Sequence, residues 1–265
     1  MISPLNKNDN PHFLAGLKAE AQKNYIEALG HFTAALSLAG DHNATWLKIA
    51  NIYLRIQQYQ QAASNFEFLL TLRPDNPQAT YGLAIAYFYL GRLDEACELI
   101  DRAVQLMPGN ATFVLDRANI LSTRSSDPQI KRQLYQDWGR QFADPLLIDE
   151  PFDLDRDPYR KLRIGYVSGD MREHSVAFFM APVFEHHDEK AVDVFVFSTD
   201  SQEDAMTARL KKLVPHWFSV ADMDDMALYH LIRKNKIDIL IDLSGHTRGH
   251  RLAVFARRAA PVQVT

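Results

Sequence analysis

Apolar and polar residues follow two different patterns along this chain, and the change falls near residue 128. Residues 9–127 repeat a helical pattern every 34 positions, with eight positions in register and no gaps. In one period these are Trp46, Ile49, Ala50, Tyr53, Tyr59, Ala62, Phe66 and Pro74; in the next they are Thr80, Leu83, Ala84, Tyr87, Leu93, Ala96, Ile100 and Pro108. Such a period indicates stacked helical hairpins, because each hairpin must bury its apolar face against the next.

Small residues recur in this pattern at the points where the two helices of a hairpin would cross, as at Gly16, Ala50 and Ala84. Pro74 and Pro108 end the second helix, since proline cannot continue a helix interior. The pattern resembles the tetratricopeptide repeat. We expect repeats at 9–42, 43–76 and 77–110 and a partial fourth at 111–127. Such an array implies a concave surface that holds a peptide or protein segment.

Residues 128–160 are expected to connect two domains. Leu134, Trp138 and Phe142 lie one turn apart and predict a helix over 129–142. Residues 144–157 then contain two prolines and six acidic residues against one arginine, without a sustained period. This composition is typical of a linker with a solvated, charged face.

Short apolar runs alternate with helical patterns from residue 161 to residue 265. We expect strands at 163–167, 192–198, 216–220 and 237–243 and from 261 onwards, and helices at 176–186, 204–214, 222–235 and 251–257. Asp222 is the expected N-cap of the third helix. Near-continuous apolar strands that alternate with helices favour a parallel sheet covered on both faces. Because the chain stops within the fifth strand, the lobe looks truncated.

The expected fold class is therefore α + α/β: a helical solenoid of repeats at 1–127, a connecting helix and acidic linker at 128–160, and a Rossmann-like parallel-sheet lobe at 161–265. Two polar clusters, 168–175 and 244–251, directly follow strands of the lobe. Carboxyl ends of parallel strands share one edge of the sheet, where ligands bind. A helix N-terminus at that edge offers backbone N–H groups to an anion. This edge is the candidate site.

Composition narrows the classes of partner. The net charge is −4 without a long basic run, so binding to nucleic acid is not expected. Cys97 is the single cysteine, which favours a reducing compartment, and its position beside Ala96 predicts a buried core residue. The N-terminus lacks the apolar core of a signal peptide, and no run approaches the ~18 apolar residues of a membrane helix. We expect a cytoplasmic protein with no membrane association.

Three motifs then carry a resemblance to one family. After the repeats come Arg-Ile-Gly-Tyr-Val-Ser-Gly-Asp at 163–170, Asp-Ile-Leu-Ile-Asp-Leu-Ser-Gly-His-Thr at 238–247, and Val-Phe-Ala-Arg-Arg-Ala-Ala-Pro-Val-Gln-Val-Thr at 254–265. This order resembles the protein O-GlcNAc transferase family, including its bacterial and SPINDLY-like members. The resemblance implies a tetratricopeptide superhelix joined to a GT-B region of two Rossmann-like lobes. This chain resembles the repeats and the first lobe. Since the family's second lobe supplies most contacts to the UDP-sugar, the chain alone is expected to be inactive.

The resemblance also implies site residues. The family's candidate catalytic histidine lies in a Gly-Asp-Phe-x-x-His-Pro segment, which places that role on His174, although Met171 and Ser175 replace the usual Phe and Pro. His174 is then the candidate base or acceptor-positioning group, with a helix-capping or surface histidine as the structural alternative. The candidate substrate-binding residues are Asp170, His246, Thr247 and Arg248, of which Asp170 is alternatively an N-cap.

The function implied is transfer of N-acetylglucosamine from UDP-GlcNAc to Ser or Thr of acceptor proteins, which the repeat groove presents. A homodimer through the repeats is a further expectation. The UDP-sugar is the donor substrate, and no cofactor or metal is expected. Two alternatives stay open: a non-catalytic repeat scaffold for protein–protein interaction, and a relative that transfers another sugar, such as glucose to Asn or fucose to Ser/Thr.

Overall fold

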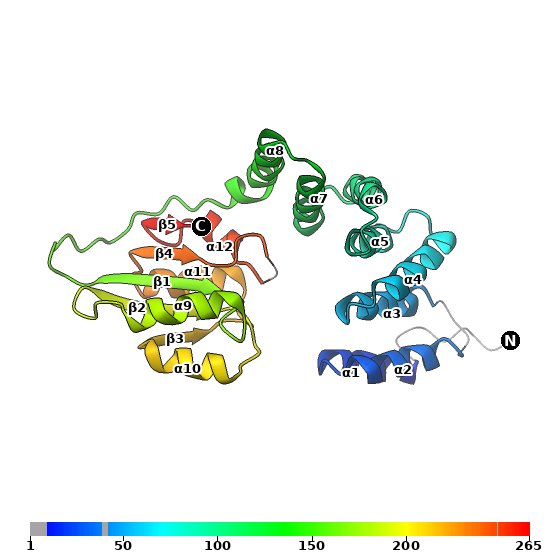
Figure 1. The fold of residues 1–265 in the computed structure, drawn as a ribbon, viewed down its shortest axis with the longest axis horizontal. Coiled ribbons are helices and arrows are strands. Elements are labelled where there is room, and N and C mark those ends of the chain that lie inside the picture. Colours follow the sequence, from blue (N-terminus) through cyan, green and yellow to red (C-terminus); the bar gives the residue numbers. More distant parts are fainter. Residues whose placement is uncertain (1–9, 39–41, 248) are drawn as a thin grey trace. The chain divides into compact units, whose positions relative to one another are not determined.

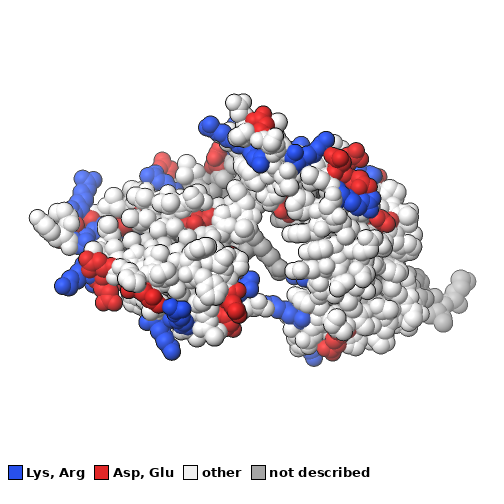
Figure 2. All heavy atoms as spheres, viewed as in Figure 1, with Lys and Arg blue, Asp and Glu red and all other residues white. Residues whose placement is uncertain are grey.

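The computed structural model describes residues 10–38, 42–247 and 249–265. The chain divides into two compact units between Trp138 and Gly139. On the face drawn in Figure 2, Lys and Arg side chains of the described residues are interspersed with Asp and Glu. Within the described ranges, no helix is both long and apolar enough to cross a lipid bilayer.

The first unit is a stack of helices, in which each helix packs on the next along the chain (Figure 1). They are α1 (Pro11–Ala21), α2 (Tyr25–Ala35), α3 (Asn43–Arg55), α4 (Tyr59–Leu72), α5 (Pro77–Tyr89), α6 (Leu93–Leu106), α7 (Ala111–Arg124) and α8 (Pro128–Trp138). The pairs α1–α2, α3–α4 and α5–α6 are the hairpins that the 34-residue period predicts, so the solenoid is confirmed.

Close helix crossings explain the small residues of the repeat. A Cβ atom added at Gly82 in α5 would lie 2.2 Å from the ring of Phe66 in α4, and one at Gly16 would lie 2.7 Å from Phe32. Both rings are fully buried, as is Cys97 at 2% exposure, which confirms the predicted core position of that cysteine. Helices α5 and α7 begin at asparagine caps one period apart, Asn76 and Asn110, whose Oδ1 atoms accept backbone N–H groups.

The connecting helix differs from the expectation. It ends at Trp138, and a single π-helical turn, Gly139–Ala143, replaces the predicted continuation to Phe142. Tyr135 donates a hydrogen bond to Asn119 Oδ1 at 2.9 Å, and the Trp138 indole donates one to the Ala111 carbonyl at 3.0 Å. Helix α8 is therefore held by α7 and lies in the first unit, whereas residues 139–160 lie in the second.

The second unit is a five-stranded, all-parallel sheet with strand order β3-β2-β1-β4-β5. The strands are β1 (Leu162–Ser168), β2 (Val192–Ser198), β3 (His216–Ser219), β4 (Ile239–Asp242) and β5 (Val262–Val264), and the helices are α9 (Ser175–Glu185), α10 (Ala205–Leu213), α11 (Asp225–Lys234) and α12 (Leu252–Ala256). The predicted alternation of strand and helix is confirmed, and β5 forms one edge of the sheet.

Helices cover both faces of this sheet because its strands are apolar on both sides. Val194 and Val196 of β2 join the core that packs under α9 and α10. Phe195 and Phe197, which point to the opposite face, join the core under α11 and α12. The expected N-cap at Asp222 is wrong: Asp224 caps α11, since its Oδ1 accepts the Ala227 N–H at 2.7 Å.

Candidate functional site

Loops that follow β1, β2 and β4 meet at the carboxyl edge of the sheet. The Ser168 carbonyl accepts the Thr199 N–H at 2.8 Å, and Ser244 Oγ accepts the Gly169 N–H at 3.2 Å. Ser168 and Ser244 are both buried, at 0% and 5% exposure. Both polar clusters predicted from the sequence therefore lie at one edge, joined by buried hydrogen bonds.

Gly249 brings the loop after β4 against the other two loops. Its φ is +85°, a conformation that favours glycine, and a Cβ atom there would lie 3.8 Å from Gly169 Cα. Thr199 Oγ1 donates a hydrogen bond to the Gly249 carbonyl at 2.8 Å. The loops after β1, β2 and β4 thus form one continuous surface.

A charged network joins the loops after β1 and β2. Arg172 Nε donates to Asp200 Oδ2 at 3.1 Å, and Arg172 Nη2 lies 4.0 Å from Asp170 Oδ1. The Asp170 side chain is 15% exposed and the Arg172 side chain 37%. Asp170 is therefore largely enclosed, while the guanidinium between the two carboxylates remains open to solvent on one side.

His174 is the N-cap of α9, the structural alternative that the sequence left open. Its Nδ1 accepts the Val176 N–H at 3.3 Å, and its side chain is 40% exposed. Asp170 does not cap this helix; its Oδ1 lies 3.9 Å from His174 Nδ1, beyond hydrogen-bond distance. The two candidate residues are neighbours at one helix start.

The segment between Asp170 and His174 is anchored to the body of the lobe. Met171, which stands where the family pattern has Phe, is buried at 2% exposure, so an apolar core position is kept. The Met171 carbonyl accepts a hydrogen bond from Thr207 Oγ1 at 2.8 Å, and Asp204 accepts the Glu173 N–H at 2.6 Å. Asp204 also caps α10, and its hydrogen bonds to the backbone N–H groups of Thr207 and Glu173 lower its pKa. These contacts fix the backbone of the residues that precede His174.

The loop after β4 is built around a buried carboxylate. Asp242, at 7% exposure, accepts the N–H groups of Ser244 and Gly245 at 2.9 Å each and the Thr265 hydroxyl at 3.0 Å. Thr247 Oγ1 donates to the Ser244 carbonyl at 2.7 Å, which leaves its oxygen lone pairs for another donor. Arg248, a predicted contact, lies outside the described residues.

His246 is exposed on this loop, yet its imidazole is partly desolvated. That desolvation and the neighbouring His250 lower the pKa of His246, and the Asp242 carboxylate opposes the shift. The imidazole of His246 is accordingly biased toward its neutral form, which can both donate and accept a hydrogen bond.

Three residues of this edge were not among those predicted from the sequence: Thr199, Asp200 and Asp242. All of them lie at or just beyond the carboxyl end of a strand, so the strand assignment itself was the usable signal. Thr199 and Asp200 contact the loops after β4 and β1, and such contacts between loops depend on the strand order, which the sequence pattern does not give.

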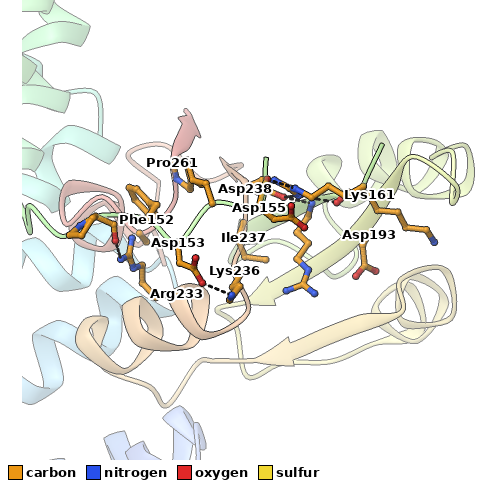
Figure 3. A pocket seen from close by; sticks show the side chains of 15 residues that line it. Phe152, Asp153, Asp155, Lys161, Asp193, Arg233, Lys236, Ile237, Asp238 and Pro261 are labelled. Atoms are coloured by element: carbon orange, nitrogen blue, oxygen red, sulfur yellow. Dashed lines mark hydrogen bonds and ion pairs between the residues drawn. The ribbon is translucent and has the colours of Figure 1, made fainter. Parts of the chain in front are cut away.

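A cavity of the lobe lies at the opposite, amino edge of the sheet (Figure 3). Its volume is about 560 Å³, and it is enclosed by residues 151–155, by the starts of β1 and β4 and by the segment before β5. Arg160 donates both Nη atoms to Asp238 at 2.7 and 2.6 Å, and Lys236 pairs with Asp153 at 2.7 Å. These charged pairs hold the linker to the lobe. The cavity is separate from the candidate site because it lies at the opposite edge of the sheet.

Both units of the chain contain segments that match known protein families. The glycosyl transferase family 41 model matches residues 146–265, and a tetratricopeptide repeat model matches residues 47–111. Residues 146–265 belong to glycosyl transferase family 41. The family 41 segment contains all three loops of the carboxyl edge, and the family resemblance seen in the three sequence motifs is confirmed.

Individual relatives show the same similarity. It is 36% identical over 137 residues to a SPINDLY-type UDP-N-acetylglucosamine–peptide N-acetylglucosaminyltransferase of Solanum lycopersicum, and 33% identical over 172 residues to one of Oryza sativa subsp. japonica. A solved structure of a Thermobaculum terrenum O-GlcNAc transferase mutant matches 95% of the chain with a TM-score of 0.86 and 33% identity. The two plant alignments cover 50% and 62% of this chain.

The chain is short beside these relatives. It spans 15% and 18% of the two plant proteins and 49% of the solved bacterial one. Its order, repeats followed by a parallel-sheet lobe, corresponds to the N-terminal portion of the O-GlcNAc transferase family.

Proposed function

We propose that this chain is part of a protein glycosyltransferase that moves N-acetylglucosamine from UDP-GlcNAc to Ser or Thr of acceptor proteins. The observation that carries the proposal is the family 41 match over residues 146–265, which contains every described residue of the carboxyl-edge site. The 265 residues by themselves are expected to be inactive, since the donor site is completed by the second lobe of a GT-B region.

The reaction makes three demands on such a site. The acceptor oxygen forms a bond to the anomeric carbon, the bond from that carbon to the diphosphate oxygen breaks with its electron pair leaving on UDP, and the hydroxyl proton must be taken up. Asp170 and His174 lie together at one helix start, where they can position the acceptor or the sugar. His246 and Thr247 are proposed to contact the sugar or a phosphate, and the same is proposed for Arg248.

The repeats are proposed to present the acceptor. Stacked hairpins create an elongated concave surface, which suits an extended peptide segment of an acceptor protein. We also propose that the repeats self-associate and that the protein is cytoplasmic. Sedimentation equilibrium of the first unit tests the former, and a monomer at all concentrations would contradict it.

A transfer assay tests the function. The full-length protein is incubated with radiolabelled UDP-GlcNAc and a cell lysate, beside its His174→Ala variant. Label on protein from the parent, and its loss in the variant, is the expected result. Labelled UDP-glucose and labelled GDP-fucose in parallel reactions identify a different donor. No label from any donor, with lysate proteins still retained by the repeats, would replace the enzyme by a scaffold.

A further inference from the structure

Two cations that line the cavity at the amino edge of the lobe have no anionic partner. Lys161 and Arg163 both line it, and neither side chain forms an ion pair with any residue that the structure describes. Arg163 Nη1 donates a hydrogen bond to the Asn235 carbonyl at 2.9 Å, which holds the guanidinium at one corner. Its Nε and Nη2 atoms donate to no described residue, so one edge of the guanidinium is left for another acceptor.

The carboxylates of the cavity do not serve these two cations, because each already accepts a hydrogen bond from another group. Both Asp238 oxygens accept Arg160 Nη atoms, although Arg163 lies close enough to favour the charged form of Asp238. The other pairs are Asp153 with Lys236, Asp155 with the Asp157 N–H, and Asp193 with His216. Five cationic side chains and four carboxylates line the cavity, so the balance of charge also favours an anion.

The rest of the lining is apolar and comes from both the linker and the lobe. It includes Phe152, Leu154, Ile237, Ala259 and Pro261. The Arg233 guanidinium lies 4.1 Å from the centre of the Phe152 ring, and its Nη2 donates to the Pro151 carbonyl at 2.8 Å. Figure 3 shows Phe152 and Arg233 at one end of the cavity and Lys161 at the other. The cavity therefore has an aromatic end, where the linker is held to the lobe, and a cationic end.

We propose that this cavity binds a small organic phosphate monoester. The phosphate group contacts Arg163 and Lys161, and the organic body lies along the apolar side chains of Leu154, Ile237 and Pro261. The volume of about 560 Å³ suits such a ligand, because pockets for small molecules typically measure about 300–1,000 Å³. The site lies at the opposite edge of the sheet from the candidate transfer site, so it goes beyond the proposed function and does not depend on it.

The geometry of Arg163 favours a phosphate. The Nε–H and one Nη2–H of a guanidinium point the same way and can bind two oxygens of one phosphate or carboxylate group. A phosphate monoester carries nearly two negative charges at neutral pH, since its second pKa is about 6. It can therefore balance both Arg163 and Lys161, whereas a monocarboxylate would leave one of the two cations without a counter-charge.

Calorimetry of the 265-residue chain with phenyl phosphate tests the site. Inorganic phosphate and benzoate are titrated in parallel, because the first lacks the organic body and the second lacks the dianionic group. We expect one saturable site that binds phenyl phosphate at least about tenfold more tightly than either. Excess UDP should leave this binding unchanged. No saturable binding, equal affinity for inorganic phosphate, or displacement by UDP overturns the proposal.

Three substitutions place the binding in this cavity. Arg163→Gln and Lys161→Gln should each weaken phenyl phosphate binding by about tenfold or more. Lys234→Gln is the matched control, since Lys234 is also exposed but does not line the cavity, and it should leave the affinity unchanged. Arg163→Gln also removes the contact with Asn235, so the Lys161 variant keeps the test decisive if the Arg163 variant fails to fold. An unchanged affinity in the Lys161 variant would contradict the proposal.

Hydrogen exchange gives a readout that does not depend on affinity. The cavity is lined by residues 151–155 of the linker as well as by the lobe, so an occupant contacts both. Saturating phenyl phosphate should slow amide exchange in residues 152–155 of the parent and not of the Lys161→Gln variant at the same concentration. Exchange in residues 152–155 that phenyl phosphate does not change would show that it binds elsewhere.

Discussion

Asp242 illustrates how single buried residues shape the site. Its carboxylate accepts three hydrogen bonds at 7% exposure, two of them from the backbone of the loop that carries His246 and Thr247. A carboxylate suits this position because it offers acceptors alone. An amide would turn N–H groups toward backbone N–H groups, and at least one buried donor would lose its partner.

We expect Asp242→Asn to destabilise the lobe by about 1–3 kcal/mol and to loosen the loop after β4. Urea unfolding gives the free energy, and hydrogen exchange of the Ser244 and Gly245 amides reports the loop. Asp222→Asn is the matched control, since Asp222 is exposed and should change stability by no more than about 0.5 kcal/mol. Equal effects of the two substitutions would contradict this account of the loop.

The lowered pKa of His246 predicts how the stability of the lobe changes with pH. Partial desolvation and His250 depress the pKa in the folded protein below the 6.5 of a free histidine, so the unfolded chain binds the proton more readily. This group therefore favours folding above about pH 6.5, and its contribution is lost as the pH falls through the lower, folded pKa. His246→Gln should flatten lobe stability across this window. Urea titrations at several pH values measure it, and an unchanged slope would show that the proton is bound equally in both states.

The sequence could predict some of these residues but not their roles. His174 and His246 stand in recognisable motifs at strand ends, so their place at one edge follows from the strand pattern. The helix cap at His174 was one of the alternatives that the sequence left open, because a histidine in that motif is also compatible with a free ring. His250 carried no motif of its own, and its position depends on Gly249 contacting a loop from another strand.

At the scale of helices, the repeat array depends on close approach between consecutive hairpins. Gly82 of α5 lies against the fully buried ring of Phe66 in α4, and an added Cβ atom would lie 2.2 Å from that ring. Gly30, in the interior of α2, has no atom within 4 Å of the same added position. These two glycines separate the steric need for glycine from its intrinsic cost in a helix.

Gly82→Ala is expected to destabilise the first unit by about 1–3 kcal/mol, because Phe66 must move within a packed core. Gly30→Ala should instead be neutral or stabilising by up to about 1 kcal/mol, since alanine is the better helix former. Thermal unfolding followed by circular dichroism compares the two. Similar destabilisation by both would mean that helix crossing does not select glycine here.

Elements were predictable where a period recurs and less so at their ends. The 34-residue repeat located the hairpins, and apolar runs located all five strands. Helix ends depended on individual side chains: Asp224 rather than Asp222 caps α11, and the expected helix over 129–142 stops at Trp138. The order β3-β2-β1-β4-β5 has no counterpart in a linear pattern, since it is set by which helices cover which face.

At the scale of the whole molecule, ion pairs at the amino edge of the sheet attach the linker to the lobe. Burial alone would raise the pKa of Asp238, but the Arg160 guanidinium and the Arg163 N–H outweigh it, so the pKa falls below its usual 3.8. The carboxylate therefore stabilises the folded lobe above about pH 4, and this contribution disappears as the pH falls through the lowered pKa.

Replacing Asp238 tests this attachment. Asp238→Asn should cost the lobe about 1–3 kcal/mol at neutral pH and reduce its sensitivity to acid below about pH 4. Lys236→Ala is the comparison, because the Lys236 and Asp153 side chains are 61% and 86% exposed and such pairs contribute little. The measurement is urea unfolding of the lobe as a function of pH. An Asp238→Asn profile parallel to that of the parent would contradict the assigned shift.

Two compact units with separate cores should unfold in two steps, and the substitutions above identify each step. Gly82→Ala changes only a contact within Met1–Trp138, and Asp238→Asn changes only contacts within Gly139–Thr265. Hydrogen exchange resolved by peptide along a urea series should therefore show the first variant shifting only peptides before Trp138 and the second only those after it. Contacts in separate cores are expected to add in the double variant. A single transition that both substitutions move together would show that the two units fold as one.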